Sequence, residues 1–190
     1  MNFTTRTVTL AVVAEAMLGV VAVAICWWFD VPLAERLTPT VEIAPRSLTA
    51  TLPMLALLMW SIRSTWRPIV ELRRQVTRMV GELFRNASLL DLALLSVAAG
   101  VGEELLFRGA LQPLAERLMG PAAGLVFVSV LFGGVHSASR AYFLLATGVG
   151  FYLGWLSQHY EELLTPIVVH AAYDFAALVV LRGRVASERG

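Results

Sequence analysis

Several features that soluble proteins usually have are missing from this sequence. Lysine is absent, so arginine supplies all 15 basic residues, and charged residues make up only 15% of the chain. Cys26 is the one cysteine, which excludes an internal disulfide, and it is expected to fill space within an apolar run. The sequence holds no internal repeat and no low-complexity tract. What dominates instead is apolar sequence.

Hydrophobic residues make up 57% of the 190 residues, and the mean hydropathy is +0.70. This excess is too large for an ordinary soluble domain and indicates a membrane protein. The pattern predicts six hydrophobic spans, at residues 8–29, 47–62, 89–107, 121–136, 141–157 and 163–181. Because a bilayer requires about 20 apolar residues, the second and fourth spans are marginal. The first is too long for a signal-peptide core and is expected to be retained as an anchor.

The placement of arginine predicts the orientation of these spans. The connection 63–88 holds six arginines against Glu71 and Glu82, whereas the connection 30–46 holds two arginines against three acidic residues. By the positive-inside rule, residues 63–88 and both termini are expected to be cytoplasmic, which makes this a multi-pass protein of the cell membrane. Arginines on the same predicted side are Arg6, Arg140, Arg182, Arg184 and Arg189.

The connection 63–88 has the pattern of an amphipathic helix. Its charged residues recur at helical spacing and its apolar residues mostly take the other side; the charged set is Arg67, Glu71, Arg74, Arg78, Glu82 and Arg85. A helix lying on the inner leaflet is favoured over a substrate gate or a nucleic-acid patch, so no nucleic-acid partner is expected. The predicted fold is an all-α polytopic membrane protein, with about six transmembrane helices plus this cytoplasmic helix.

Ionisable side chains inside three of the spans are the strongest sign of a functional site, because such groups are costly in a membrane. Glu104 and Arg108 are four residues apart, with the acid on the N-terminal side, which favours an ion pair within one helix. Glu103 is rotated by about 100° from Glu104 and has no such partner. We therefore expect Glu103 to be the carboxylate left free for general-base chemistry.

Two further polar pairs lie on the fourth and sixth spans. Gly120 is the predicted turn before the fourth span, and Glu104 and His136 each lie sixteen residues from it. An antiparallel hairpin would therefore place them at similar depth, provided that the helix carrying Glu104 continues past Pro113. His170 and Asp174 are four residues apart and share one face of the sixth span.

The three motifs in order, Glu103-Glu104-xxx-Arg108, Phe132-xxx-His136 and His170-xxx-Asp174, resemble those of the CPBP intramembrane proteases. That family includes the CAAX prenyl endopeptidases and proteins linked to bacteriocin self-immunity. The resemblance covers residues 89–181, which would form a four-helix catalytic core. Residues 1–88 would add two spans and the amphipathic helix, and residues 182–190 a cytoplasmic tail.

The resemblance implies hydrolysis of a peptide bond in a membrane-associated protein or peptide. Glu103 would activate a water, assisted by His136, while His170 and Asp174 stabilise the oxyanion. The residues that hold the site in shape would be Glu104, Arg108 and Phe132. An ionised Asp174 would repel an oxyanion, so this residue is either protonated or orients His170 through a hydrogen bond.

The cofactor is left open by the sequence. Glu103, His136 and His170 would make a three-ligand site of the kind that catalytic zinc uses, so a divalent metal such as zinc is one alternative. The HExxH spacing of zinc proteases is absent, which favours a metal-free glutamate mechanism.

Other functions are weaker alternatives. A non-proteolytic scaffold or immunity protein would have no chemical reason to keep Glu103, His136 and His170, and a proton-coupled transporter would often show an inverted repeat. Serine chemistry lacks its G-x-S-x-G signature. Of the remaining polar residues, Glu15 and Asp91 are expected to face a neighbour's polar group, and His159 to be a solvated surface residue.

Overall fold

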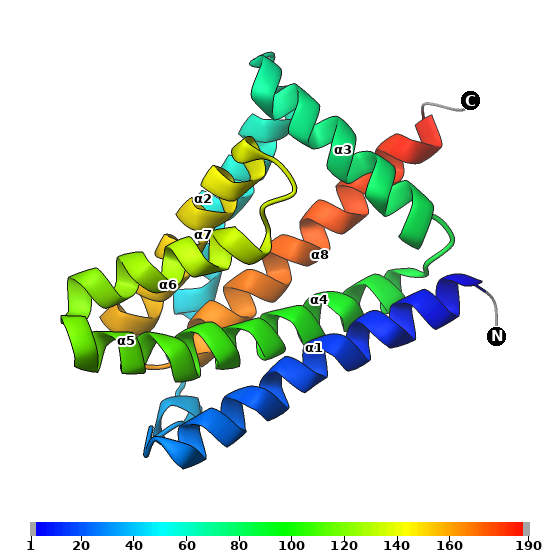
Figure 1. Cartoon of the computed structure of the whole chain (residues 1–190). Coiled ribbons are helices and arrows are strands. Elements are labelled where there is room, and N and C mark those ends of the chain that lie inside the picture. Colours follow the sequence, from blue (N-terminus) through cyan, green and yellow to red (C-terminus); the bar gives the residue numbers. More distant parts are fainter. Residues whose placement is uncertain (1–2, 188–190) are drawn as a thin grey trace.

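The computed structural model describes residues 3–187, and these residues form helices and loops without a strand (Figure 1). The all-helical class predicted from the sequence is therefore confirmed. In chain order the helices are α1 (Phe3–Trp28), the 3₁₀ turn η1 (Glu35–Leu37), α2 (Ile43–Arg63), α3 (Arg67–Phe84), α4 (Leu89–Glu104), the π-helical η2 (Leu105–Leu111), α5 (Gln112–Met119), α6 (Pro121–Val135), α7 (Arg140–Tyr160) and α8 (Leu164–Ser187). Residues 182–187, expected in the tail, continue α8, whereas Arg189 lies outside the described residues.

Three helical segments are long and apolar enough to cross a membrane: Thr5–Trp28, Ile43–Arg63 and Leu164–Arg184. Pro121–Val135 is a shorter apolar helix, and α4 has only 16 residues. Large apolar side chains also point outward, among them Leu10, Leu90 and Leu144, each about 70% exposed. Such a surface is unfavourable in water and suits contact with lipid. The structure thus indicates a membrane protein, while the number of six spans stays a prediction.

Helices α4, η2 and α5 follow one another without a break, so one continuous helical segment runs from Leu89 to Met119. It begins at a capping box, in which the Ser88 hydroxyl accepts from the Asp91 amide at 3.1 Å and the Asp91 carboxylate accepts from the Ser88 amide at 2.8 Å. Asp91 therefore faces the polar groups of its neighbour Ser88, as expected, and caps its own helix. The capping box explains why this polar pair precedes an apolar run.

The π-helical segment lies directly after Glu104, ahead of Pro113. A proline ring clashes with the carbonyl four residues before it, here that of Gly109, which therefore needs another donor. The Cys26 thiol provides one at 3.6 Å, and Arg36 donates to the neighbouring Arg108 carbonyl at 2.9 Å. Cys26 thus does more than the space-filling predicted for it. Single-turn π segments of this kind often occur at functional sites.

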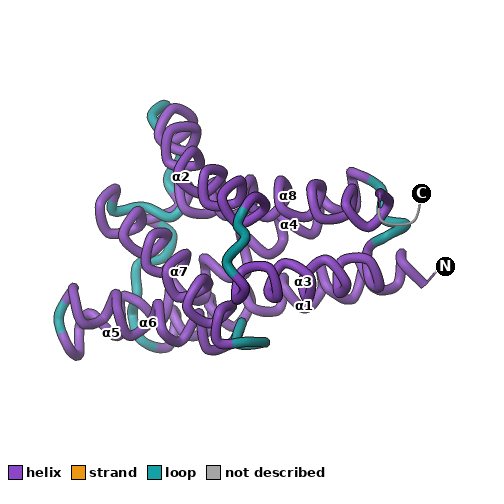
Figure 2. Tube along the Cα trace, turned by 90° about the horizontal axis from the view of Figure 1, so that it is seen from above, coloured by secondary structure: helices purple, strands orange, loops and turns teal. Residues whose placement is uncertain are grey.

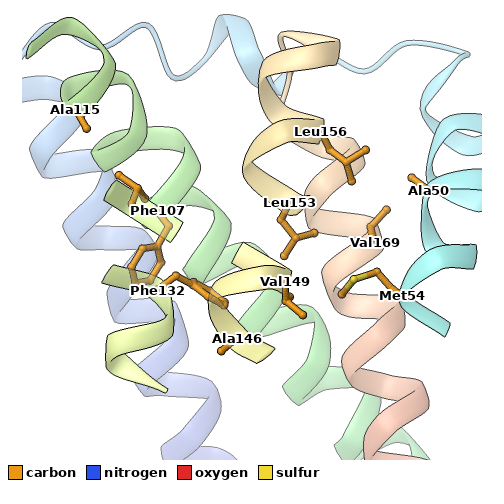
Figure 3. Packing of buried hydrophobic residues seen from close by; sticks show 11 residues of the cluster. Ala50, Met54, Phe107, Ala115, Phe132, Ala146, Val149, Leu153, Leu156 and Val169 are labelled. Atoms are coloured by element: carbon orange, nitrogen blue, oxygen red, sulfur yellow. The ribbon is translucent and has the colours of Figure 1, made fainter. Parts of the chain in front are cut away.

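Helix α8 runs through the middle of the bundle and contacts α2, α3, α4 and α7, while α1 packs along α4 and α6 along α7 (Figures 1 and 2). A buried cluster joins α2, α6, α7 and α8 with the π segment, and Figure 3 shows Phe107, Phe132, Val149 and Leu153 pointing into it. The rings of Phe107 and Phe132 meet edge to face, with centroids 5.1 Å apart. This core lies next to the polar residues of the predicted site.

Helix α3 is amphipathic as predicted, but its apolar face does not lie on lipid. Ile69, Leu72 and Val80 are buried, and the helix contacts α1, α2, α7 and α8. Its charged residues form an exposed stripe, consisting of Arg67, Glu71, Arg74, Arg78, Glu82 and Arg85. Apolar side chains at helical spacing fit a lipid surface and a protein surface equally, so only packing could decide between them. Helix α3 therefore closes one side of the bundle. The first turn of α1 and the last turn of α8 lie at the same end of the bundle (Figure 1).

Candidate active site

An ion pair without access to solvent forms the inner part of the site. Glu104 and Arg108 are 0% and 1% exposed, and the Arg108 Nη1 lies 2.6 Å from the Glu104 Oε1. The Arg108 Nη2 donates to the Gly150 carbonyl of α7 at 2.9 Å. Burying two charges costs several kcal/mol each, and the cost is offset only where geometry and additional hydrogen bonds are good. The pair meets this condition and ties α4 to α7.

Phe132 lies between this ion pair and the histidine of its own motif. Its ring lies 4.4 Å from the Arg108 guanidinium carbon and 4.6 Å from the His136 ring, measured to ring centroids. A Cβ at Gly150 would approach the Phe132 ring to 3.1 Å, so the absence of a side chain there permits the close packing. Phe132 therefore fixes the position of Arg108 and of His136 at once.

Both site histidines are held through the Nδ1 atom. The His136 Nδ1 lies 2.8 Å from the Phe132 carbonyl oxygen, and the His170 Nδ1 lies 2.8 Å from the Glu104 Oε1. Since a carbonyl and a carboxylate oxygen accept, each Nδ1 carries the hydrogen. This leaves both Nε2 atoms directed at the other carboxylate of the pair, Glu103.

Each oxygen of the Glu103 carboxylate faces a different histidine. Its Oε1 lies 3.7 Å from the His136 Nε2, and its Oε2 lies 4.0 Å from the His170 Nε2. Both distances exceed a direct hydrogen bond and suit a bridging water. The Glu103 residue is 9% exposed, so the carboxylate is shielded but reachable. This arrangement differs from that of Glu104, whose Oε1 is shared between two donors.

Asp174 completes the set but does not orient His170. Its Oδ2 lies 3.5 Å from the His170 Nε2, at the limit of a hydrogen bond, and its side chain is 32% exposed. The hydrogen bond that orients the His170 ring comes from Glu104 instead. The spacing of His170 and Asp174 could not show this, because the deciding partner lies on another helix.

A cavity of about 360 Å³ gives access to these groups. Glu103, His136, His170 and Asp174 line it together, whereas the Glu104–Arg108 pair lies behind the wall. Apolar side chains of α3 form the opposite wall, among them Ile69, Leu72, Val76, Met79 and Phe84. All seven residues predicted for the site thus lie in one region: five line the cavity, Phe132 among them, and Glu104 and Arg108 support them from behind.

Glu15 also lines the cavity, which the sequence did not indicate. It lies in the middle of α1, and its Oε2 is buried with no hydrogen-bond partner among the described residues. The expectation that it faces a neighbour's polar group is wrong. A lone carboxylate inside a 26-residue apolar helix was the available signal. His159 stacks on Trp155, with ring centroids 5.0 Å apart, and lies far along α7 from the site.

The metal alternative was tested on the arrangement of the donors. Within the described residues, no group of three or more His, Cys, Asp or Glu side chains is arranged to hold a metal ion. No zinc site is thus found among the described residues, and no step of the reaction is assigned to a metal.

Fold and site together define a helical membrane protein with a shielded glutamate–histidine centre. Residues 85–176 match the family model of the type II CAAX prenyl endopeptidase Rce1-like proteins, and the match contains all three motifs. The segment is thus an Rce1-like domain, and the resemblance to the CPBP intramembrane proteases is confirmed. No curated protein and no solved structure gives a significant match. Because the Rce1-like proteins are proteases, the family indicates a peptidase that acts on a membrane-associated protein.

Proposed function

We propose that this protein is an intramembrane endopeptidase in which Glu103 activates a water for attack on a peptide bond. The observation that carries the proposal is the position of the two Nε2 atoms, 3.7 and 4.0 Å from the Glu103 oxygens at the surface of a cavity. A water between Glu103 and His136 donates one hydrogen to the carboxylate and one to the His136 Nε2. Its lone pairs then face the cavity, where the substrate carbonyl lies.

The reaction follows from these positions. Glu103 takes a proton from the water as the water oxygen bonds to the carbonyl carbon, and it later delivers this proton to the leaving nitrogen as the C–N bond breaks. His170 presents its Nε2 side to the developing oxyanion. Asp174 lies beside it, with its Oδ2 3.5 Å from the His170 Nε2. In this scheme Glu103 lies opposite a cationic His170, and Glu104 lies opposite Arg108.

Glu104, Arg108 and Phe132 serve as positioning residues in this scheme. Glu104 fixes the His170 ring through the Nδ1 atom, and Phe132 fixes His136 through its backbone carbonyl. Outer partners of this kind set the tautomer and the direction of a functional histidine. Residues 89–181 supply the reactive groups, while residues 1–88 contribute α1 and the α3 wall. The chain crosses the cell membrane several times, and both termini are cytoplasmic.

The experiment that tests the proposal compares membrane-protein termini by mass spectrometry in cells carrying the native protein or Glu103→Gln. Glutamine keeps the shape and hydrogen bonding of the side chain but does not act as a base. A terminus present only with the native protein establishes proteolysis and identifies a substrate. Identical termini, together with rescue of a deletion phenotype by both forms, would favour the non-proteolytic scaffold instead.

A further inference from the structure

Glu15 is the one carboxylate of α1, and its position ties it to the proposed reaction centre. Helix α1 packs so tightly on α4 that a Cβ at Gly102 would overlap the backbone carbonyl of Glu15. Gly102 immediately precedes Glu103, so the two carboxylates start from adjoining points of the two helices. Glu15 also lines the same cavity as Glu103, His136, His170 and Asp174.

The charge of Glu15 has no partner among the described residues. Its Oε2 is buried without a hydrogen bond, whereas the nearby cations are already engaged. Arg108 is paired with Glu104, and Arg73, which also lines the cavity, donates to the Ser61 and Ile62 carbonyls at the end of α2, at 2.7 and 3.0 Å. A buried carboxylate oxygen without a donor is unfavourable, so the cavity lacks a hydrogen-bond donor for the Glu15 Oε2.

The charges at the cavity surface indicate which kind of chemical group would supply this donor. Three carboxylates line the cavity, those of Glu15, Glu103 and Asp174, and of these Glu103 faces both histidines while Asp174 faces only His170. The hydroxyls of Tyr142 and Tyr173 are neutral, and the remaining wall is mostly apolar. Among the described residues that line the cavity, the Oε2 atoms of Glu15 and Glu103 both lack a hydrogen-bond partner. Glu103 faces the two histidines, so an entering positively charged group finds its free carboxylate at Glu15.

From this geometry we infer that Glu15 is a specificity-determining residue, which binds a basic side chain of the peptide substrate close to the bond that is cut. The inference rests on the proposed peptidase function. It assigns α1, which lies outside the matched segment 85–176, a direct part in substrate choice. The apolar wall of α3 accommodates the apolar part of the same substrate, so the preferred segment is apolar with one embedded arginine or lysine.

The test measures cleavage of quenched fluorogenic peptides by the full-length protein in lipid nanodiscs. The peptides share one apolar segment and differ at a single scanned position, which holds arginine, its neutral isostere citrulline, or glutamate. We expect kcat/KM to favour arginine over citrulline by about 10- to 100-fold at one position, which corresponds to a hydrogen bond to a charged group. The preference should arise in KM, because the contact forms on binding.

Glu15→Gln is the decisive variant, since it removes the charge and keeps the shape. The arginine-to-citrulline ratio of kcat/KM should fall to about one through a rise in KM for the arginine peptide, and the thermal unfolding midpoint should not fall. Glu82→Gln, the same change at an exposed carboxylate of α3, should keep the preference. Glu15→Arg should transfer the preference to the glutamate peptide. An unchanged ratio in Glu15→Gln, or an equal loss of kcat for every peptide, would overturn the inference.

Binding to the Glu103→Gln protein separates this inference from the proposed function. Fluorescence anisotropy with the same peptides should show the arginine preference, and Glu15→Gln in that background should abolish it. If the preference follows Glu15 while the native protein cleaves none of the peptides, recognition stands and proteolysis fails. If the native protein cleaves the peptides with no preference that depends on Glu15, proteolysis stands and the inference fails. Absence of binding by every peptide would also overturn it.

Discussion

The two adjacent carboxylates of α4 lie in opposite surroundings. Glu104 is 0% exposed, and its Oε1 accepts from Arg108 at 2.6 Å and from His170 at 2.8 Å. Glu103 reaches the cavity and has its nearest ionisable neighbours at 3.7 and 4.0 Å. We call the first region, made of Glu104, Arg108 and Phe132, the inner cluster, and the second, made of Glu103, His136, His170 and Asp174, the cavity cluster.

The two clusters differ in their roles, because the inner cluster stabilises the fold and the cavity cluster carries the reactive groups. Short contacts hold the inner cluster in one arrangement, and its charges compensate one another without solvent. The cavity cluster is held through its outer atoms only, which leaves the Nε2 atoms and the Glu103 oxygens available for a water and a substrate. Changes in the inner cluster should therefore lower stability, and changes in the cavity cluster should lower activity. Each prediction below tests one side of this division.

The largest effect is expected for His136→Ala. General acid–base groups contribute about 10²- to 10⁴-fold to rate, so cleavage should fall by that factor. The His136 side chain is 25% exposed and packs on the Phe132 ring, so the thermal unfolding midpoint in detergent should fall less than after a change in the inner cluster. Cleavage of a substrate found by terminus mapping provides the measurement. A large fall in the unfolding midpoint, together with the loss of cleavage, would contradict the division into two clusters.

Arg108→Ala should have the largest effect on stability. It leaves Glu104 buried without its cation and removes the donor to the Gly150 carbonyl, which together should cost about 3–5 kcal/mol. Thermal unfolding of the purified protein in detergent gives the measurement. Arg67→Ala, at an exposed arginine of α3, is the control and should leave the midpoint unchanged. A midpoint shift as small as that of the control would show that the inner cluster does not hold the bundle.

A smaller effect is expected where α1 meets α4. Gly102→Ala places a methyl group against the Glu15 carbonyl and should cost about 1–3 kcal/mol as the two helices separate. Gly148→Ala provides a matched control within α7, because a Cβ there meets nothing within 4 Å. This control should be neutral or slightly stabilising, since alanine favours a helix over glycine. Equal midpoints for the two variants would contradict the close approach of α1.

The smallest effect is expected outside both clusters, at the start of α4. Ser88→Ala removes the hydroxyl of the capping box and should cost about 1 kcal/mol, without a change in kcat. Hydrogen exchange of the first turn of α4 would report the loss of the cap directly. Faster exchange limited to this turn is the expected result, and a loss of activity would show that the N-terminal end of α4 is coupled to the site.

The sequence was sufficient to predict the positions of most helices and the seven residues that lie together at the candidate site. Apolar runs predicted the positions of α1, α2, α6, α7 and α8 closely, because each run ends at polar or turn residues. The three motifs predicted which seven residues come together. These features depend on local pattern and on residue types that are costly in a membrane.

Other features depend on packing and could not be predicted. The π segment arises where Pro113 and Cys26 act on the Gly109 carbonyl and Arg36 acts on the neighbouring Arg108 carbonyl, although these residues are distant in sequence. The partner of each histidine is set by neighbouring backbone and side-chain atoms rather than by spacing. The place of Glu15 follows from the absence of a side chain at Gly102, which a pattern of apolar residues does not reveal.

The measurement that tests the central claim most directly compares Glu103→Gln with Glu104→Gln, in cleavage and in thermal unfolding. The two substitutions are the same and their positions adjoin, so only the surroundings differ. We predict that Glu103→Gln abolishes cleavage and keeps the unfolding midpoint, because the Glu103 oxygens make no short contact. Glu104→Gln should lower the midpoint, since it leaves Arg108 buried without an anion. Two variants with the same loss of activity and the same change of midpoint would contradict the division into an inner and a cavity cluster.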